Sequence, residues 1–497
     1  MTDRPQPAPP APSSAEARFD ATRRRVGLVL GPLVFLLVLV LPFGQLSPEA
    51  QRLAAVVALV IVFWITEALP LPVTALLGPT LAVLLAVAPV RETFAPFANP
   101  LIFLFVGSFI LARALFVHRV NERIAYAVLS WRFIGARPTR ILIAYGAIAT
   151  CLSAWMSDTA TAAMLVPMGM SLLAFMESEG NVPKRYGTAL MLMTSYGSLR
   201  GGMATPVGTP PNLIAIGMLD QQLGIRITFV EWMLVAVPVT VVLMGIVFGY
   251  FNWIGRTGTR EIPGADRIIA ERRRALGPWK PGERNAVIAF GVTVSLWIIP
   301  GLLPLVLGPD HPVAEAVLAS VPEAVAALVG VAVLFLLPVS ATQRSTITWK
   351  EAAQIDWGTI LLFGGGLALG TLSATTGLAQ VVGEGITSLV PAERVALTFA
   401  AALFTVLLSE TMSNTAATNI SVPIIISIAQ AAGVDPVVPV VAAGLSASVA
   451  AMLPVSTPPN AIVYASGKIP ITSMIKYGIV MDIVAVVTVP TMVLLLM

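Results

Sequence analysis

Two short polar segments with nearly the same sequence interrupt long apolar runs, and this repeat constrains the fold more than any other feature. The first segment reads SAWMSDTA (153–160) and the second reads SETMSNTA (409–416). Downstream of each, a proline-rich segment recurs, TPVGTPPN (205–212) in the first half and LPVSTPPN (453–460) in the second. The pattern predicts two related halves, each with a polar tip and a Thr-Pro-Pro-Asn break, as in membrane transporters built from repeats.

The composition assigns the chain to integral membrane proteins. Of its 497 residues 57% are hydrophobic and only 11% are charged, whereas soluble domains carry about 25% charged residues. Apolar runs of membrane-spanning length recur along the chain, and because they are continuous rather than alternating, a β-barrel is excluded. The single cysteine, Cys151, excludes an internal disulfide. The basic residues lie mainly in short loops, so the net charge of +4 does not indicate nucleic-acid binding.

The N-terminal region predicts the orientation of the chain. Residues 1–25 begin with a segment rich in proline, alanine and serine and end in a cluster of arginines, which predicts a disordered cytoplasmic segment. We find no signal-peptide cleavage pattern, so the first apolar segment is expected to remain as a membrane helix. The chain is thus predicted to be a multi-pass protein of the inner (plasma) membrane with a cytoplasmic N-terminus.

Two repeats follow in the predicted organisation. The first covers 26–253, with scaffold helices to about residue 117, a re-entrant hairpin at 139–178 and a broken helix at 187–219 that is interrupted at Gly201-Gly202 and again at 206–211. A basic cytoplasmic linker, 254–285, separates it from the second repeat, 286–497, which has a hairpin at 393–431 and a broken helix at 437–466. We expect about eleven membrane helices, and this odd number places the second repeat upside down relative to the first.

The tips and the breaks have complementary chemistry. Each tip exposes the free N–H groups at the start of a helix, which favour carboxylate or sulfate oxygens, and its serine, threonine and asparagine side chains add further donors. At the breaks proline removes donors, so free carbonyl groups can ligate a hard cation such as Na⁺. The alternative is that these polar residues only hold helices together, which the recurrence of both motifs disfavours.

On these motifs the chain resembles the divalent anion/sodium symporter family of di- and tricarboxylate (and sulfate) transporters. The segments WITEALPLPVT (64–74), FANPLIFLF (97–105) and LLFGGGL (361–367) also fit that family, and the resemblance extends from about residue 27 to the end. It implies a homodimer in the membrane lipid, each protomer having a scaffold and a transport domain that moves as an elevator. It implies no enzymatic activity and no cofactor, with Na⁺ as the coupling ion.

The resemblance also implies which residues bind. The substrate carboxylates would contact the tips and the breaks, at Ser157, Asp158, Thr159, Thr209, Pro210, Ser413, Asn414, Thr415, Thr457 and Pro458. A sodium ion in the second half would be held by Ser409, Ser413, Asn414, Val455 and Ser456, and one in the first half by Ser153, Ser157, Asp158 and the Gly208 region.

The first tip departs from the family pattern, because Asp158 stands where the family carries asparagine, and Arg200 stands where it carries a small or apolar residue. A bare carboxylate about 5 Å from a substrate charge would cost roughly 3 kcal/mol at an effective dielectric constant of about 20. A bound cation, a proton or Arg200 could neutralise it. We favour an Arg200–Asp158 pair that weakens the first sodium site and leaves coupling to the second; the alternatives are that Arg200 contacts substrate or an interface and that Asp158 ligates sodium.

Two further carboxylates, Glu67 and Glu410, stand within the motifs. We expect Glu67 to cap or pair within the scaffold and Glu410 to support the second tip loop. The leading function is secondary transport of a small dianion, most simply a four- or five-carbon dicarboxylate. The alternative is a sodium-independent or proton-linked dicarboxylate exchanger, followed by a sulfate transporter and an anion channel. An intramembrane enzyme is disfavoured, because Ser157 and Asp158 have no histidine or lysine near them in the sequence.

Overall fold

The computed structural model shows an all-helical fold among the residues that it describes, which are 14–41, 43–44, 46–178, 183–256, 261, 264–308, 311–387 and 393–497. By length and composition, eight of the described helices could cross a membrane, or nine when the bent pair α14 (Pro312–Ser320) and α15 (Glu323–Leu336) counts as one span. The all-helical membrane class predicted from the sequence is confirmed, whereas the total of about eleven spans stays a prediction.

The first half of the chain begins with helices that precede the hairpin. These are α1 (Ser14–Val40), α2 (Pro48–Thr66), α3 (Leu71–Leu84), α4 (Val90–Phe94), the 3₁₀ helix η1 (Ala95–Ala98), α5 (Pro100–Val117) and α6 (Val120–Leu129). The chain then forms α7 (Pro138–Ser153), α8 (Asp158–Ser178), α9 (Lys184–Met203), α10 (Pro210–Leu223), α11 (Phe229–Ile254) and, within the basic linker, α12 (Ala265–Ala275).

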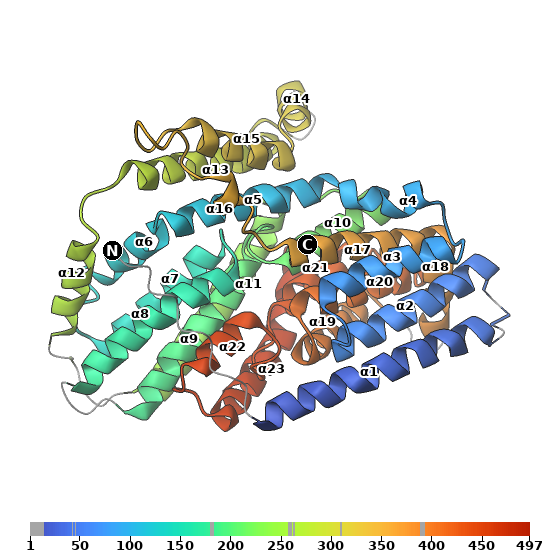
Figure 1. Cartoon of the computed structure of the whole chain (residues 1–497), viewed down its shortest axis with the longest axis horizontal. Coiled ribbons are helices and arrows are strands. Elements are labelled where there is room, and N and C mark those ends of the chain that lie inside the picture. The colour runs from blue at the N-terminus through green and yellow to red at the C-terminus, as the bar shows by residue number, and fades with distance from the viewer. Residues whose placement is uncertain are drawn as a thin grey trace.

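The second half of the chain contains the remaining helices. Besides α14 and α15 they are α13 (Pro281–Leu307), α16 (Trp349–Ala352), α17 (Trp357–Thr375), α18 (Leu378–Thr387), α19 (Arg394–Thr411), α20 (Asn414–Ala431), α21 (Val437–Ala447), α22 (Pro458–Ala465) and α23 (Ile471–Leu496). Figure 1 shows the first-half hairpin beside α9 and α11, and the second-half hairpin on the other side of the molecule beside α2, α3 and α17.

Matched helices make matched contacts in the two halves. Helix α7 packs against α9, and its counterpart α19 packs against α21. The halves also exchange contacts, because α8 touches α22 of the second half while α20 touches α10 of the first. Residues 186–203 of α9 are all buried, as are residues 438–447 of α21. The two broken helices thus form the centre of the molecule, and the hairpins pack around them.

Two boundaries differ from the sequence prediction. Helix α1 begins at Ser14, so the predicted disorder of residues 14–25 is wrong; alanine, glutamate and arginine there favour a helix, and Arg23 pairs with Glu67 at 3.0 Å between Nη2 and Oε2. The prediction for residues 1–13 falls outside the described residues. The predicted pairing of Glu67 within the scaffold is confirmed.

The first helix break also differs from the prediction. Gly201 and Gly202 lie inside α9, which ends at Met203, so the chain unwinds only over 204–209. A Cβ atom on Gly201 would stand 2.6 Å from the Cα of Thr150 in α7, which is closer than real contacts allow. This glycine therefore permits close packing of α7 on α9 and does not interrupt the helix.

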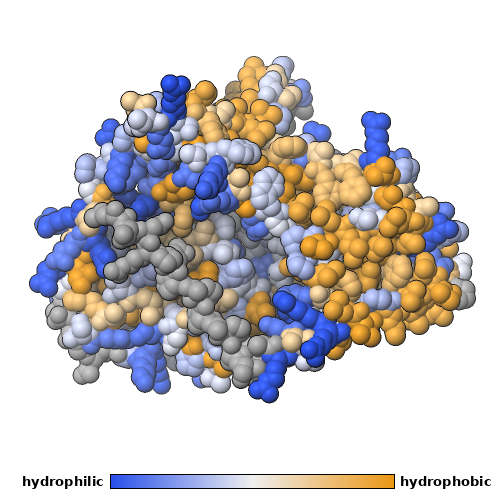
Figure 2. Space-filling view, viewed as in Figure 1, coloured by the Kyte–Doolittle hydropathy of each residue, from blue (hydrophilic) through white to orange (hydrophobic). Residues whose placement is uncertain are grey.

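The surface has a large apolar area. Figure 2 shows hydrophobic side chains over the side of the molecule where α2, α3 and α18 lie, and hydrophilic side chains at the edge near α12. Exposed apolar residues recur along the long outer helices α1 and α13, such as Val29 and Leu36 in the first and Ile299 and Leu305 in the second. An exposed apolar surface of this kind suits a lipid environment.

Candidate functional site

Each hairpin tip is built by the serine that caps its second helix. Ser413 is the N-cap of α20, and its side chain accepts a hydrogen bond from the backbone N–H of Ala416 at 3.2 Å. At the first tip Ser157 accepts from the N–H of Ala160 at 3.4 Å. At the second tip this leaves the N–H groups of Asn414 and Thr415 available, which is the electropositive arrangement that suits an anion. At the first tip the N–H of Thr159 instead donates to Oδ1 of Asp158.

The helix breaks are shaped by the asparagine that ends each Thr-Pro-Pro-Asn motif. In the first half Nδ2 of Asn212 donates to the carbonyl oxygens of Gly202 at 2.9 Å and Thr205 at 2.7 Å. In the second half Nδ2 of Asn460 donates to the carbonyl oxygens of Ala450 and Leu453, both at 3.2 Å. Each asparagine folds the unwound chain back on the start of the helix that follows.

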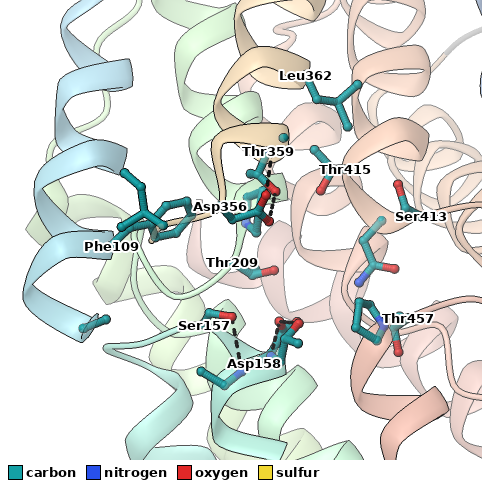
Figure 3. A pocket seen from close by; sticks show the side chains of 18 of the residues that line it. Phe109, Ser157, Asp158, Thr209, Asp356, Thr359, Leu362, Ser413, Thr415 and Thr457 are labelled. Atoms are coloured by element: carbon teal, nitrogen blue, oxygen red, sulfur yellow. Dashed lines mark hydrogen bonds between the residues drawn. The ribbon is translucent and has the colours of Figure 1, made fainter. Parts of the chain in front are cut away.

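Both tips and both breaks line one cavity of about 590 Å³. All ten residues predicted to contact substrate lie in its wall, and so does Gly208. Figure 3 shows Ser157 and Asp158 on one side of the cavity and Ser413, Thr415 and Thr457 on another, with Thr209 between them. The structure thus brings together four segments that are up to about 300 residues apart in the chain. Their role in binding stays a prediction.

The opposite wall of the cavity comes from segments that the motif analysis did not single out. They include Phe109 and Arg113 of α5 and Gln354, Asp356 and Thr359 at the start of α17. Asp356 caps α17 by accepting from the N–H of Thr359 at 3.1 Å, and both residues face the cavity in Figure 3. The sequence carried one signal for them, since an aspartate directly before an apolar run marks a helix start.

The cavity wall carries opposite charges. Asp158 and Asp356 are its acidic residues and Arg113 is the one basic residue of the described lining. Nη2 of Arg113 donates to Oε1 of Gln354 at 2.5 Å, which orients the guanidinium along the wall. A dianion in this cavity would therefore meet helix N-termini and hydroxyl groups at the tips, and one arginine on the opposite wall.

The predicted sodium ligands lie at or just behind the tips. Ser153 ends α7 and Ser409 lies in the last turn of α19, both with no exposed surface, and Ser456 is 1% exposed in the second break. Val455 has an apolar side chain, so its backbone carbonyl is the group suited to a cation. The residue is half exposed. The hydroxyl of Ser153 has no hydrogen-bond partner among the described residues. These oxygen donors fit the ligand chemistry of a small hard cation.

The predicted pair between Arg200 and Asp158 is not formed. The Oδ1 atom of Asp158 accepts from the N–H of Thr159 at 2.7 Å, and the other carboxylate whose charge reaches it is Asp356. Arg200 interacts electrostatically with Tyr196, Asp482 and Glu410. The hypothesis fails because α9 directs this side chain toward α19 and α23 and away from the first tip.

Glu410 is a structural support, as predicted, but it supports a different segment. Its Oε1 atom accepts from the backbone N–H groups of Ala451 at 2.5 Å and Met452 at 2.9 Å, in the second helix break rather than in the tip loop. Asp482, which approaches Glu410 from α23, was missed by the motif analysis. The sequence does contain a signal for Asp482, because an acidic residue in the middle of the last apolar span is unusual.

Comparisons with known proteins agree with this architecture. The family model described as "Sodium:sulfate symporter transmembrane region" matches residues 22–496. A protein named sodium-dependent dicarboxylate transporter SdcS from Staphylococcus aureus (strain bovine RF122 / ET3-1) is 32% identical over 472 residues, covering 93% of this chain and 89% of the relative. The SdcS of strain MRSA252 is 32% identical over 477 residues, covering 94% and 90%.

Two solved structures share the fold. The Alcanivorax borkumensis YdaH transporter matches with a TM-score of 0.55 and 16% identity over 97% of this chain and 98% of that one. Neisseria gonorrhoeae MtrF, whose structure is titled as illuminating a class of antimetabolite efflux pumps, matches with a TM-score of 0.55 and 14% identity over 81% and 82%. With the family model matching nearly the whole chain, this protein belongs to the sodium:sulfate symporter family, also called the divalent anion/sodium symporters, and is a membrane transporter.

Proposed function

We propose that this protein is a secondary active transporter of small divalent anions, with four- and five-carbon dicarboxylates as its substrates. The observation that carries the proposal is the shared cavity, because two helix N-termini and a set of hydroxyl groups meet there at a size suited to a small molecule. The name of the S. aureus relatives supports a dicarboxylate over sulfate.

An elevator movement is the proposed mechanism. One wall of the cavity belongs to the tips and breaks, and the other belongs to α3, α5 and α17 of the proposed scaffold. A substrate held at this boundary can move with the tips past the other wall without passing through either domain. We also propose that the chain works as a homodimer in the membrane, as the family resemblance implies.

Sodium coupling is proposed to rest mainly on the second-repeat site. There Ser409, Ser413, Asn414 and the carbonyl groups near Val455 and Ser456 would supply neutral oxygen ligands. The first site is altered, because Asp158 adds a carboxylate and Arg200 does not neutralise it. Of the candidates that remain, a bound cation suits the site because the buried hydroxyl of Ser153 has no other partner among the described residues.

A thermal-shift screen of purified protein tests the substrate class. Succinate, malate, 2-oxoglutarate, citrate and sulfate are each added with sodium or with an equal concentration of potassium. A ligand at 100 times its Kd stabilises the folded state by about 2.7 kcal/mol, so a substrate should raise the unfolding temperature. We expect a dicarboxylate to do so and sulfate not to, and the reverse result would assign the protein to sulfate.

The presence of Asp158 at the first tip favours one second candidate, a sodium-independent or proton-linked dicarboxylate exchanger. Proteoliposome uptake of the dicarboxylate separates the two. A symporter takes up substrate into empty vesicles when sodium is present outside. An exchanger requires unlabelled substrate inside and ignores sodium, and that outcome would overturn the proposed coupling while leaving the substrate assignment in place.

A further inference from the structure

Three ionisable side chains from three helices meet in the interior, away from the cavity wall. Arg200 of α9 is 1% exposed, Glu410 of α19 is 3% exposed and Asp482 of α23 is 6% exposed. The charge of Arg200 reaches both carboxylates, and its Cζ atom lies 4.7 Å from the centre of the Tyr196 ring. Charged groups buried at membrane depth are expensive, so their retention indicates function.

Ala451 in the second helix break is hydrogen-bonded at both its N–H and its carbonyl group. Glu410 accepts from the N–H of Ala451, and also from the N–H of Met452. The hydroxyl of Tyr196 donates to the carbonyl oxygen of Ala451 at 3.1 Å. Ala451 thus has its donor bound by the second half and its acceptor bound by the first. The unwound chain cannot rotate at this residue without breaking one of these bonds.

A second contact from α9 secures the other end of the same segment. The hydroxyl of Ser195 donates to Oδ1 of Asn460 at 2.5 Å. The amide nitrogen of Asn460 in turn donates to Oγ of Ser456 at 3.0 Å, besides its two bonds to backbone carbonyls. Residues 448–457 are therefore held from α9 at Ala451 and, through Asn460, at Ser456.

Arg200 forms no direct ion pair with either carboxylate in the described part of the chain, so its charge acts on them over a longer distance, whereas Asp482 approaches Glu410 directly. Nε and Nη1 of Arg200, Oε2 of Glu410 and both carboxylate oxygens of Asp482 are buried without a hydrogen-bond partner among the described residues. Two carboxylates lie near one guanidinium, so loss of Arg200 leaves them without a compensating cation, and loss of Glu410 leaves the N–H groups of Ala451 and Met452 unpaired.

The first helix break has no equivalent cluster. When Asn212 is aligned with Asn460, the position of Arg200 corresponds to Ser448, and when the two tip segments are aligned, the position of Glu410 corresponds to Ala154. Neither counterpart is charged. If the cluster served only to close the pseudo-symmetric fold, the first break would need it as well. It is therefore specific to the break that provides Val455 and Ser456.

We propose that Arg200, Glu410 and Asp482 form a clasp that positions residues 448–457 and thereby sets the sodium affinity of the second-repeat site. The three act as positioning residues, because the described contacts place none of them in the cavity wall. Glu410 binds the backbone of the break, Arg200 acts on the Glu410 carboxylate by its charge from the first half, and Asp482 approaches Glu410 from α23. The sodium part of this inference rests on the proposed function, whereas the positioning part does not.

The experiment compares Glu410→Gln and Asp482→Asn with Glu67→Gln in the purified full chain. Glu67→Gln is the control, because it likewise replaces a carboxylate that lies near an arginine, here Arg23, but it does so in the proposed scaffold and away from the break. Hydrogen exchange of peptides covering 448–457 reports the clasp directly. Loss of a charged hydrogen bond predicts about tenfold faster exchange in Glu410→Gln, a smaller increase in Asp482→Asn and none in Glu67→Gln.

Sodium-dependent uptake in proteoliposomes provides the second measurement. We expect the sodium concentration for half-maximal uptake to rise about tenfold in Glu410→Gln, with near-normal substrate affinity at saturating sodium. A merely structural role would lower the amount of folded protein and the maximal rate without moving the sodium curve. If Glu410→Gln does not fold, Asp482→Asn, which leaves the backbone contacts of Glu410 in place, is judged by the same two measurements.

The outcomes separate the two proposals. Unchanged exchange over 448–457 in both clasp variants overturns the clasp. Faster exchange with an unmoved sodium curve overturns its link to the sodium site. If the wild-type protein transports without sodium, the proposed coupling fails, and the exchange data alone then decide whether the clasp exists.

Discussion

The two hairpin tips have matching sequences, but their side chains are bonded differently. At the second tip the hydroxyl of Ser409 lies 2.7 Å from Oδ1 of Asn414 and 2.6 Å from the carbonyl oxygen of Ala447. At the first tip the equivalent hydroxyl, of Ser153, has no partner among the described residues, and Asp158 bonds instead to Thr159. The two tips therefore share a motif, but the difference between Asp158 and Asn414 goes with different hydrogen bonds inside each tip.

The two helix breaks also have matching sequences but different hydrogen bonds. Both asparagines of the Thr-Pro-Pro-Asn motifs donate to backbone carbonyls, yet only Asn460 also accepts a bond, from Ser195 of the other half. Oδ1 of Asn212 has no partner in the described part of the chain. The second break is thus bonded to the other half of the chain, whereas the first is bonded to residues of its own half, such as Ala154 and Trp232. Variants at these matched positions test whether the difference matters.

The largest effect is expected from Asn460→Ala. The variant removes the donor to Ala450 and Leu453 and leaves Ser195 unpaired, and each buried polar group left unsatisfied costs about 1–3 kcal/mol. We expect uptake to fall by more than about tenfold, and the unfolding temperature to drop further than in Asn212→Ala. Uptake and thermal unfolding of the two variants measure this. If uptake and unfolding temperature fall equally in both variants, the bond from Ser195 to Asn460 contributes nothing to transport or stability.

An intermediate effect is expected from Asp158→Asn, which gives the first tip the amide of the second. If Asp158 ligates a cation, replacing its charge should weaken sodium binding, because an ionised ligand 4 Å from Na⁺ contributes up to about 4 kcal/mol at an effective dielectric constant of about 20. The same change removes repulsion of the substrate, so dicarboxylate affinity at saturating sodium should rise. Sodium titrations of uptake and substrate titrations by thermal shift separate these two shifts.

Asp356→Asn is the matched control for that experiment. It removes a carboxylate from the same cavity but from the opposite wall, and asparagine caps a helix about as well as aspartate. The sodium curve should not move in this variant. If Asp158→Asn and Asp356→Asn behave alike, the first tip holds no cation, and Asp158 acts only through the net charge of the cavity.

The parts of the fold that recur in both halves could be predicted from the sequence. The tips at 157–159 and 413–415, the Thr-Pro-Pro-Asn breaks and the hairpin arms follow from matched motifs, and the structure places the polar residues of both motifs around one cavity. Local chemistry explains this success, because serine caps and proline breaks act on their own neighbours. Gly201 shows the limit of the approach, since its close approach to α7 depends on packing and not on local sequence.

The parts that could not be predicted depend on which way a buried helix faces. Nearly every residue of α9 is buried, so no hydrophobic pattern indicates where Arg200 points. Its carboxylate partners lie 210 and 282 positions farther along, at Glu410 and Asp482. The wall of the cavity at Arg113 and Asp356 is likewise made by helices distant in sequence. Each of these is a tertiary contact without a local signature.

The smallest effect is expected from the serine caps, and it sharpens the comparison of the tips. Ser413→Ala removes a cap that accepts from Ala416, whereas Ser157→Ala removes a longer bond beside Asp158, which already accepts from Thr159. Loss of an N-cap costs about 1 kcal/mol, so Ser413→Ala should lower the unfolding temperature slightly more than Ser157→Ala in the absence of substrate. Adding dicarboxylate should widen the gap if the second tip holds the substrate more tightly. If Ser157→Ala instead lowers the unfolding temperature more, the first tip, which carries the aspartate, contributes more to stability and to substrate binding.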